Sequence, residues 1–472
     1  MLDEDVVLKS ARYANERVLI LNTLALVLLP AIFDGGSSVV GFCLIFSIGL
    51  IAPVNMLTYP ANWIDAPEYS RLKYFAALLP YIAFLALSCF RLEIPAVEYS
   101  PEYGGFFFLN GSQNPLAAAF IDGFAAMTDP IVLLVAAACA VSAYFVTQSR
   151  FVLRNTMILC GASVAVLTLV GWILKAVAGI NAPAQTGLMA SEAFSTFSDG
   201  RAWSPFALMW AAALFAVGIY TVQRFRPLSM LLSKRTAVLG MGALVFAGAA
   251  YSASPFFLPV CWLVMAFIAA IYMFNVLPSE ARMAIHGKMA GEAHKKLPIS
   301  KKIFPFMFYA AAFAASCAAC AASYFKYADF REGAAGTPYA AQEAAMREDC
   351  QKLIEEKPLF GWGPDSFATV SALTQGDDLE FAPRPAAETS LEETLLENGK
   401  VLTAALAVVP ALFFIRMVLR MRISQSGLIL MASLAACAFL GIFENPFNSP
   451  SVIISFWVLM FCMYSWENAE II

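Results

Sequence analysis

Carboxylates are concentrated in one short stretch of this chain. Residues 388–399 read ETSLEETLLENG and hold four glutamates, although only 14% of the 472 residues are charged and 60% are hydrophobic. A glutamate can act as a general base on a hydroxyl group when its surroundings raise its pKa toward neutrality. By residue type alone, a solvated helix face explains the pattern better than a catalytic site does. The position of the stretch in the chain must therefore decide between the two.

A glycine-rich turn precedes the acidic stretch. GWGPDSF, residues 361–367, places Gly361 and Gly363 around a tryptophan, ahead of a proline and an aspartate. Glycine lets the backbone approach a ligand or another segment closely, and proline and aspartate favour tight turns. Such a turn, taken alone, is more often structural than functional. Ser390 followed by Glu393 forms a capping box, which predicts that a helix begins there.

Several kinds of site are not expected from the sequence. It holds no nucleotide-binding loop, no metal-ligand cluster and no nucleic-acid patch, so we expect no metal, no cofactor and no nucleic-acid partner. Cys317 and Cys320 have CxxC spacing, but the alanine-rich apolar run around them favours packing of small residues over a metal or redox site. The other cysteines, Cys350 excepted, also lie in apolar runs and imply no disulfide framework.

Membrane helices are the elements that must position these motifs. The mean hydropathy of +0.70 is far above that of a soluble domain. Apolar runs of roughly 17 to 22 residues, long enough to span a bilayer, recur along the chain, and in lipid they must be helical. The twelve expected spans are 18–33, 39–58, 73–90, 129–147, 155–177, 205–223, 236–252, 256–277, 303–324, 400–418, 426–443 and 451–466.

The basic loops indicate the orientation of these spans. When the spans alternate, every Lys- and Arg-rich loop falls on one side, which predicts that both termini are cytoplasmic. On the opposite side lies the acidic loop 325–399, with 15 acidic and six basic residues. We expect an all-α polytopic membrane protein with three parts: spans one to nine in 1–324, a helical extracytoplasmic loop domain in 325–399, and the last three spans in 400–472.

The order of these motifs resembles the O-antigen ligase and polymerase family of bacterial membrane glycosyltransferases. KPLFGWGPDSF (357–367) is similar to the family's P-L-x-G-x-G-P-x-x-F turn, and ETSLEETLLENG to its H-x-D-x-L-Q-x-L-x-E-x-G helix. TFSDGRAWSPFALMW (196–210) resembles the family stretch that opens an outer helix end, and GIFENPFNSPSVIISFW (441–457) its closing segment. Together these cover about half the chain.

The resemblance implies a GT-C-like fold in the bacterial inner membrane and transfer of a glycan from a polyprenyl-pyrophosphate carrier to a lipid or glycan hydroxyl acceptor, without a metal. Glu388 stands where the family carries its proposed base, a histidine; the only two histidines here lie in the basic loop 278–302. Positive charge is needed where the pyrophosphate develops its charge. Arg201 lies one residue from an arginine position of the family, and Gly361, Gly363 and Glu397 fall on its motifs, so the resemblance implies them for substrate binding. Arg331 and Arg384 are candidates because they are basic residues of the outer loop, with Arg347 and Lys175 as further candidates.

Two alternatives remain at this point. A family member that has lost catalysis would act as a membrane scaffold or lipid-glycan binder, which the missing histidine and the missing arginine in YSASPFF (251–257) both allow. A twelve-helix transporter would fit the number of spans. A transporter is less well supported, because the two halves share no detectable repeat and no charged residue lies at mid-membrane depth.

Overall fold

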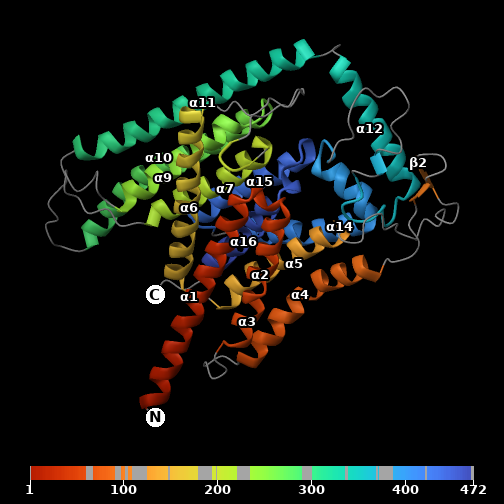
Figure 1. Cartoon of the computed structure of the whole chain (residues 1–472). Coiled ribbons are helices and arrows are strands. Elements are labelled where there is room, and N and C mark those ends of the chain that lie inside the picture. The colour runs from red at the N-terminus through yellow and green to blue at the C-terminus, as the bar shows by residue number, and fades with distance from the viewer. Residues whose placement is uncertain are drawn as a thin grey trace.

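The structure is a computed structural model of the whole chain (Figure 1). It describes residues 2–59, 67–90, 97–100, 105–108, 125–146, 149–178, 194–197, 199–220, 234–289, 300–334, 338–367, 370–371, 386–419 and 423–468.

Helices make up nearly all of the described chain. The helices of the first half are α1 (Leu2–Ile32), α2 (Val39–Gly49), α3 (Ile51–Leu57), α4 (Pro67–Phe90), α5 (Ala125–Val146), α6 (Arg150–Ala178) and α7 (Gly200–Tyr220). Those of the second half are α9 (Lys234–Ser252), α10 (Phe257–Met289), α11 (Ser300–Ala334), α12 (Pro338–Glu356), α14 (Ser390–Leu419), α15 (Gln425–Phe443) and α16 (Pro450–Asn468). Two short 3-10 helices, η1 (Asp34–Gly36) and η3 (Pro446–Asn448), connect α1 to α2 and α15 to α16.

Each of the twelve expected spans falls on a helix, the second being divided into α2 and α3. Ten of the described helical segments are long and apolar enough to cross a membrane; α4 and α9 are the expected spans outside that set. By length and hydropathy the chain is therefore a multi-pass membrane protein.

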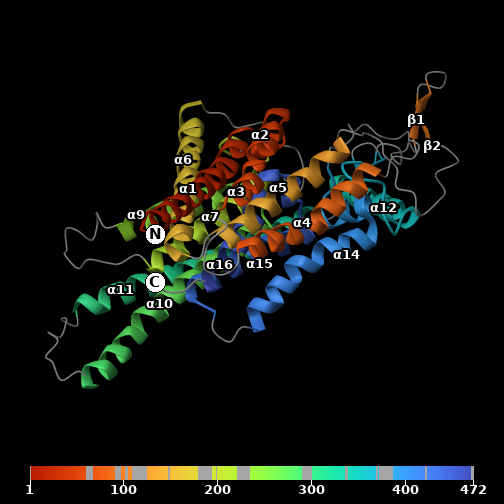
Figure 2. The same ribbon diagram turned by 90° about the horizontal axis from the view of Figure 1, so that it is seen from below.

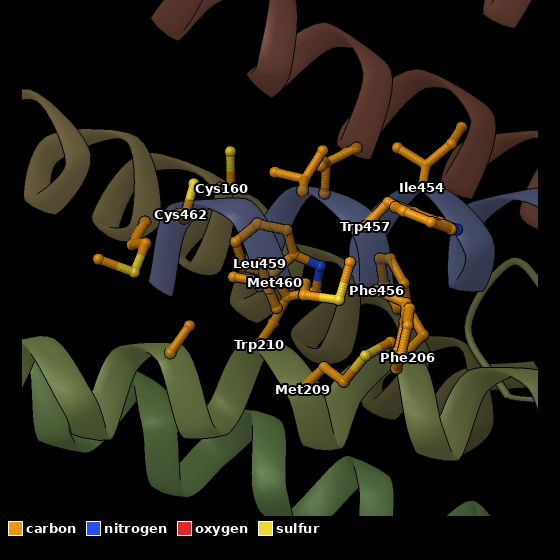
Figure 3. Packing of buried hydrophobic residues seen from close by; sticks show 14 of the residues in the cluster. Cys160, Phe206, Met209, Trp210, Ile454, Phe456, Trp457, Leu459, Met460 and Cys462 are labelled. Carbon is orange, nitrogen blue, oxygen red and sulfur yellow. The ribbon is translucent and has the colours of Figure 1, made fainter. Parts of the chain in front are cut away.

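The core lies around α7, the most deeply buried of these segments. Its Trp210 is fully buried and donates from Nε1 to the hydroxyl oxygen of Ser455 on α16, at 3.0 Å. Figure 3 shows Trp210 and Met209 of α7 facing Leu459 and Met460 of α16. Because an indole N–H in an apolar core needs an acceptor, the Ser455 hydroxyl fixes how these two helices face each other.

The expected all-α fold is confirmed, and one short hairpin is added to it. Strands β1 (Val97–Ser100) and β2 (Gly105–Phe108) form an antiparallel hairpin, with Val97 paired to Phe108. The hairpin and α12 lie together at one end of the molecule, away from the marked termini, in both views (Figures 1 and 2). Two of the expected domain limits, at 324 and 399, fall inside α11 and α14.

The acidic stretch begins a helix as predicted, but its cap differs. The N-cap is Thr389, whose hydroxyl accepts from the N–H of Glu392 at 3.0 Å, and not Ser390. Glu393 instead accepts from the N–H of Ala387 at 3.2 Å. The N-cap therefore lies one residue earlier than expected, and this leaves the Ser390 hydroxyl available for a longer-range contact.

Candidate functional site

The glycine-rich turn and the acidic helix are joined through their backbones. The N–H of Trp362 donates to the carbonyl of Leu396 at 2.9 Å, and that of Gly363 to the carbonyl of Glu397 at 2.8 Å. Gly361 has a φ of 68°, and a Cβ there would lie 2.4 Å from the carbonyl oxygen of Glu397. Only glycine permits that conformation and that approach together. We call this pairing of 358–363 with 396–401 the backbone clasp.

A break in α14 forms the second half of the clasp. Gly399 has φ 67° and ψ 177°, so the helix ends there and restarts. The freed N–H of Lys400 donates to the carbonyl of Pro358 at 2.8 Å, and that of Val401 to Leu359 at 3.2 Å. A Cβ on Gly399 would lie 2.4 Å from the Leu359 carbonyl carbon. The clasp thus sets the angle between the acidic helix and the apolar helix that follows it.

A small separate core supports the clasp from the α12 side. Trp362 is buried and donates from Nε1 to the carbonyl of Leu353 at 2.9 Å. The Lys357 ammonium lies 4.5 Å from the centre of the Trp362 ring, and burial lowers the pKa of Lys357. Cys350, the cysteine of the polar loop, lies in the same core, and burial raises its pKa to about 12. Cys350 is therefore a packing residue and not a reactive thiol.

A cavity of about 310 Å³ lies beside the clasp, between α14, α16, α5 and α4. Its apolar lining includes Phe84, Leu133, Leu406, Ile453, Phe456 and Trp457. Its polar lining includes Asp129, Ser390, Glu393, Glu397, Asn398 and Asn445. A cavity with a hydrocarbon-like wall and a polar group of residues is suited to an amphiphilic ligand.

Glu393 is the cavity carboxylate with the most defined orientation. Its Oε2 accepts from the Ala387 N–H and from the side-chain amide of Asn445, which itself donates to the Ala387 carbonyl at 3.2 Å. Within the described residues Oε1 has no hydrogen bond. A carboxylate oriented through one oxygen, with the other open to a cavity, has the geometry of a general base.

Glu397 and Asn398 lie deeper, next to the clasp. Glu397 is 3% exposed, and its carboxylate accepts from the backbone N–H of Asp365 and, at 3.4 Å, from that of Phe367. Asn398 is 6% exposed, and its Oδ1 is buried without a hydrogen-bond partner in the described part of the chain. Because an unpaired buried carbonyl costs free energy, this oxygen marks a place where a donor would be stabilised.

Asp129, at the first turn of the α5 span, completes the acidic group. It interacts electrostatically with Asp365 and Glu393, and Glu397 interacts with all three. None of the residues that line the cavity is a lysine, arginine or histidine. The described lining of the cavity therefore combines carboxyl and amide side chains with no basic side chain.

A hydrogen-bonded chain leads from the start of α14 to α15 and η3. The Ser390 N–H donates to the carbonyl of Glu444 at 3.0 Å. The Ser390 hydroxyl donates to Oδ1 of Asn445 at 2.6 Å and accepts from the N–H of Phe447 at 3.2 Å. Asn445 therefore connects this chain directly to Glu393.

Glu444, at one end of this chain, interacts electrostatically with the arginine expected at the site. It is 2% exposed, and the Ser254 hydroxyl donates to its Oε1. Burial raises the pKa of Glu444 to about 7, the Ser254 hydrogen bond and the charge of Arg201 oppose that rise, and Asp199 adds to it. Arg201 itself pairs through Nε with Asp199 at 3.0 Å. Ser254 belongs to the YSASPFF turn in which the family resemblance implies an arginine.

The structure brings together only some of the residues expected from the sequence. Glu397 lines the cavity, while Gly361 and Gly363 form the clasp. Arg201 lies near Glu444 but does not line the cavity. Glu388 is half-buried just before α14 and is also not among the lining residues.

The other basic candidates lie elsewhere or are not described. Arg331 and Arg347 are exposed, and Arg331 lines a separate hollow with Tyr324 and Tyr327. The Lys175 ammonium lies 4.0 Å from the centre of the Tyr251 ring. Arg384 lies outside the described residues.

Sequence reasoning missed Asp129, Asn398, Asn445 and Glu444 as members of one site. Their signal was weak: Asp129 opens an apolar span, and Glu444 and Asn445 interrupt the apolar run between the last two spans. Within the described residues, no three His, Cys, Asp or Glu side chains are close enough together to hold a metal ion.

Comparison with known proteins adds no further identification. The chain matches no protein-family model, no curated protein and no solved structure.

Proposed function

We propose that the protein transfers a glycan from a polyprenyl-pyrophosphate carrier to a hydroxyl acceptor at the extracytoplasmic face of the bacterial inner membrane. The cavity carries this proposal: it has an apolar wall from membrane helices and an oriented carboxylate, Glu393, beside it. The reaction joins a lipid-linked donor to a polar nucleophile, so it requires a site of this mixed character.

Glu393 is the general base of the proposed reaction. Its open Oε1 takes the proton of the acceptor hydroxyl while the acceptor oxygen forms a bond to the anomeric carbon of the donor sugar. The bond from that carbon to the pyrophosphate oxygen breaks, and the pyrophosphate leaves with the electron pair. Asn445 and the Ala387 N–H act as the orienting groups on Oε2. This assigns to Glu393 the role that the sequence resemblance implies for Glu388.

The pyrophosphate is placed at Arg201 and not inside the acidic cavity. Three carboxyl groups line the cavity, and no described lining residue is a cation that could stabilise a doubly charged leaving group. The positive charge of Arg201 acts on Glu444, and Asn445, the residue after Glu444, donates to Glu393. Arg384, outside the described residues, is the second proposed phosphate ligand.

The test uses purified full-length protein in liposomes that contain an undecaprenyl-pyrophosphate oligosaccharide and a candidate lipid acceptor. The measured quantity is undecaprenyl pyrophosphate released. We expect Glu393→Gln to lower the release by about 100-fold or more, as for loss of a general base. Glu392→Gln is the matched control because Glu392 lies on the same helix and does not line the cavity. Equal release from both variants would exclude Glu393 as the base.

A second candidate function is binding of a lipid-linked glycan without turnover. The specific observation that favours it is the absence of any lysine or arginine from the described cavity lining, because an enzyme must stabilise the leaving group. Saturable binding of the donor, with no release across several acceptors, would establish the binder and exclude the transferase.

A further inference from the structure

We infer that the hollow near the C-terminal end of α11 binds a membrane phospholipid whose headgroup carries both a phosphate and a primary ammonium group. This hollow is separate from the cavity beside the clasp and shares no described lining residue with it. The inference therefore does not depend on the proposed function.

One face of α11 forms the described wall of the hollow. The lining residues are Tyr324, Tyr327, Ala328, Arg331 and Glu332, and the volume is about 370 Å³. Because they follow one another at intervals of three or four residues along a helix, their side chains lie on the same side of α11. A volume of this size is in the range of binding sites for small molecules and lipid headgroups.

The hollow lies where three membrane spans end. Arg331 and Glu332 are close to the end of the apolar span of α11. Phe256, directly before α10, has its ring centre 5.7 Å from that of Tyr327 and 4.9 Å from that of Phe443, the last residue of α15. Both α10 and α15 are long and apolar enough to cross a membrane. The charged end of the hollow is therefore at the depth of the lipid headgroups.

An exposed apolar surface continues from the hollow along α15. Phe439 and Phe443 are both exposed, and their ring centres lie 5.0 Å apart. Ile442 is exposed beside them. Apolar side chains left uncovered on a membrane span face the acyl chains of lipid. A lipid whose chains lie on this surface would have its headgroup at the hollow.

The two charged residues of the hollow determine which headgroup fits. Arg331 and Glu332 are exposed, and neither forms an ion pair or a hydrogen bond with another described residue. A guanidinium group binds phosphate through two parallel hydrogen bonds, and a primary ammonium group gives three donors to a carboxylate. A headgroup with both groups compensates both side chains. A headgroup with phosphate alone would leave Glu332 beside a second negative charge.

An ordinary interfacial belt of aromatic residues is the alternative explanation for Tyr324 and Tyr327. Tyrosines are enriched at both membrane interfaces, where their rings suit any phospholipid. A belt of this kind predicts no preference among headgroups, whereas the charge pair of Arg331 and Glu332 predicts one. The preference is therefore the quantity to measure.

The test follows binding of single lipids to the purified full-length protein in neutral maltoside detergent by native mass spectrometry. The probes are dioleoyl phosphatidylethanolamine and dioleoyl phosphatidylglycerol, which share the acyl chains and the phosphate and differ in the ammonium group. We expect one molecule of the phosphatidylethanolamine to bind about threefold to fivefold more tightly than the phosphatidylglycerol, the size of one exposed ion pair.

Two substitutions remove the charges of the hollow one at a time. Glu332→Gln should abolish the preference, because it removes the partner of the ammonium group. Arg331→Gln should weaken the binding of both lipids, because both carry the phosphate. Asp329→Asn and Lys326→Gln are the matched controls, since both residues are exposed on α11 and do not line the hollow. Both controls should keep the wild-type preference.

Four results would overturn the inference. Equal affinity of the wild type for the two lipids would leave only an aromatic belt. Tighter binding of the phosphatidylglycerol would indicate a site for anionic lipid instead. A preference that persists in Glu332→Gln would place the selecting carboxylate elsewhere. Loss of the preference in Asp329→Asn or Lys326→Gln would show that it arises from the general surface charge of α11 and not from the hollow.

Discussion

The backbone nitrogen of Trp362 lies 2.9 Å from the carbonyl oxygen of Leu396, and this hydrogen bond joins the glycine-rich turn to the acidic helix. The next residue, Glu397, lines the cavity, so the position of its carboxylate depends on the turn. Gly361 and Gly363 therefore act on the site by holding Glu397, and their contacts in the structure are with protein backbone.

Gly361→Ala should destabilise the protein by about 1–3 kcal/mol, because the new Cβ meets the Glu397 carbonyl at a positive φ. The quantity to measure is the thermal unfolding midpoint in detergent. Gly240→Ala is the matched control, since Gly240 lies in α9 with open space where a Cβ would be. If both variants unfold at the wild-type temperature, the close approach of turn and helix does not exist in solution.

Trp362→Phe should lower the free energy of unfolding by about 1–3 kcal/mol, because it leaves the Leu353 carbonyl without its side-chain donor in a buried core. The same substitution also weakens the contact with the Lys357 ammonium. Trp262→Phe is the comparison, because half-buried Trp262 makes an edge contact with Phe246 but no hydrogen bond to the described residues. Chemical denaturation followed by circular dichroism measures both, and equal losses would refute the importance of the indole hydrogen bond.

Much of the fold could be predicted from hydropathy alone. Each expected span falls on a helix because about 20 consecutive apolar residues permit almost no other structure in lipid. The helix start at residue 390 was also predictable, from its cap-forming residues. The cap itself was misplaced by one residue, because both Thr389 and Ser390 can cap, and the contact of Ser390 with Asn445 decides between them.

The site could be predicted only in part, for a physical reason. Local patterns identified the turn and the acidic helix, which are about 25 residues apart in sequence. Asp129 lies in α5 and Asn445 just before η3, and both line the same cavity. How these distant segments pack together cannot be inferred from a local sequence pattern. The family-like position of Glu388 directed attention to a carboxylate that does not line the cavity, whereas Glu393, in the first turn of α14, does.

Glu388→Gln should retain most of the transfer activity, whereas Glu393→Gln should lose it. Both changes replace a carboxyl group by an amide of nearly the same volume, so any difference between the two variants comes from the position of the carboxyl group. The measurement is the initial rate of undecaprenyl pyrophosphate release at saturating donor. If Glu388→Gln loses most of the release activity and Glu393→Gln keeps it, Glu388 is the general base, as the sequence resemblance implies.

Glu444 should make stability depend on pH. Burial raises its pKa from 4.5 to about 7, so the protonated form is favoured in the folded state. Its contribution to stability is fully present below about pH 4.5 and is lost as the pH rises through about 7. The unfolding midpoint of the wild type should therefore fall relative to that of Glu444→Gln between those two values. Parallel pH profiles for the two proteins would show that the carboxyl is not buried as described.

Arg201→Gln should move that pH transition upward. The positive charge of Arg201 lowers the pKa of Glu444, so its removal leaves burial and the Asp199 charge less opposed. Arg201→Lys keeps the charge and should keep the transition near its wild-type position, although it loses the Nε contact with Asp199. The unfolding midpoint of each variant is measured across the pH range, beside the same variant carrying Glu444→Gln. An upward shift that persists in the Glu444→Gln background would arise from another group, and the electrostatic connection between Arg201 and the cavity chain would then be wrong.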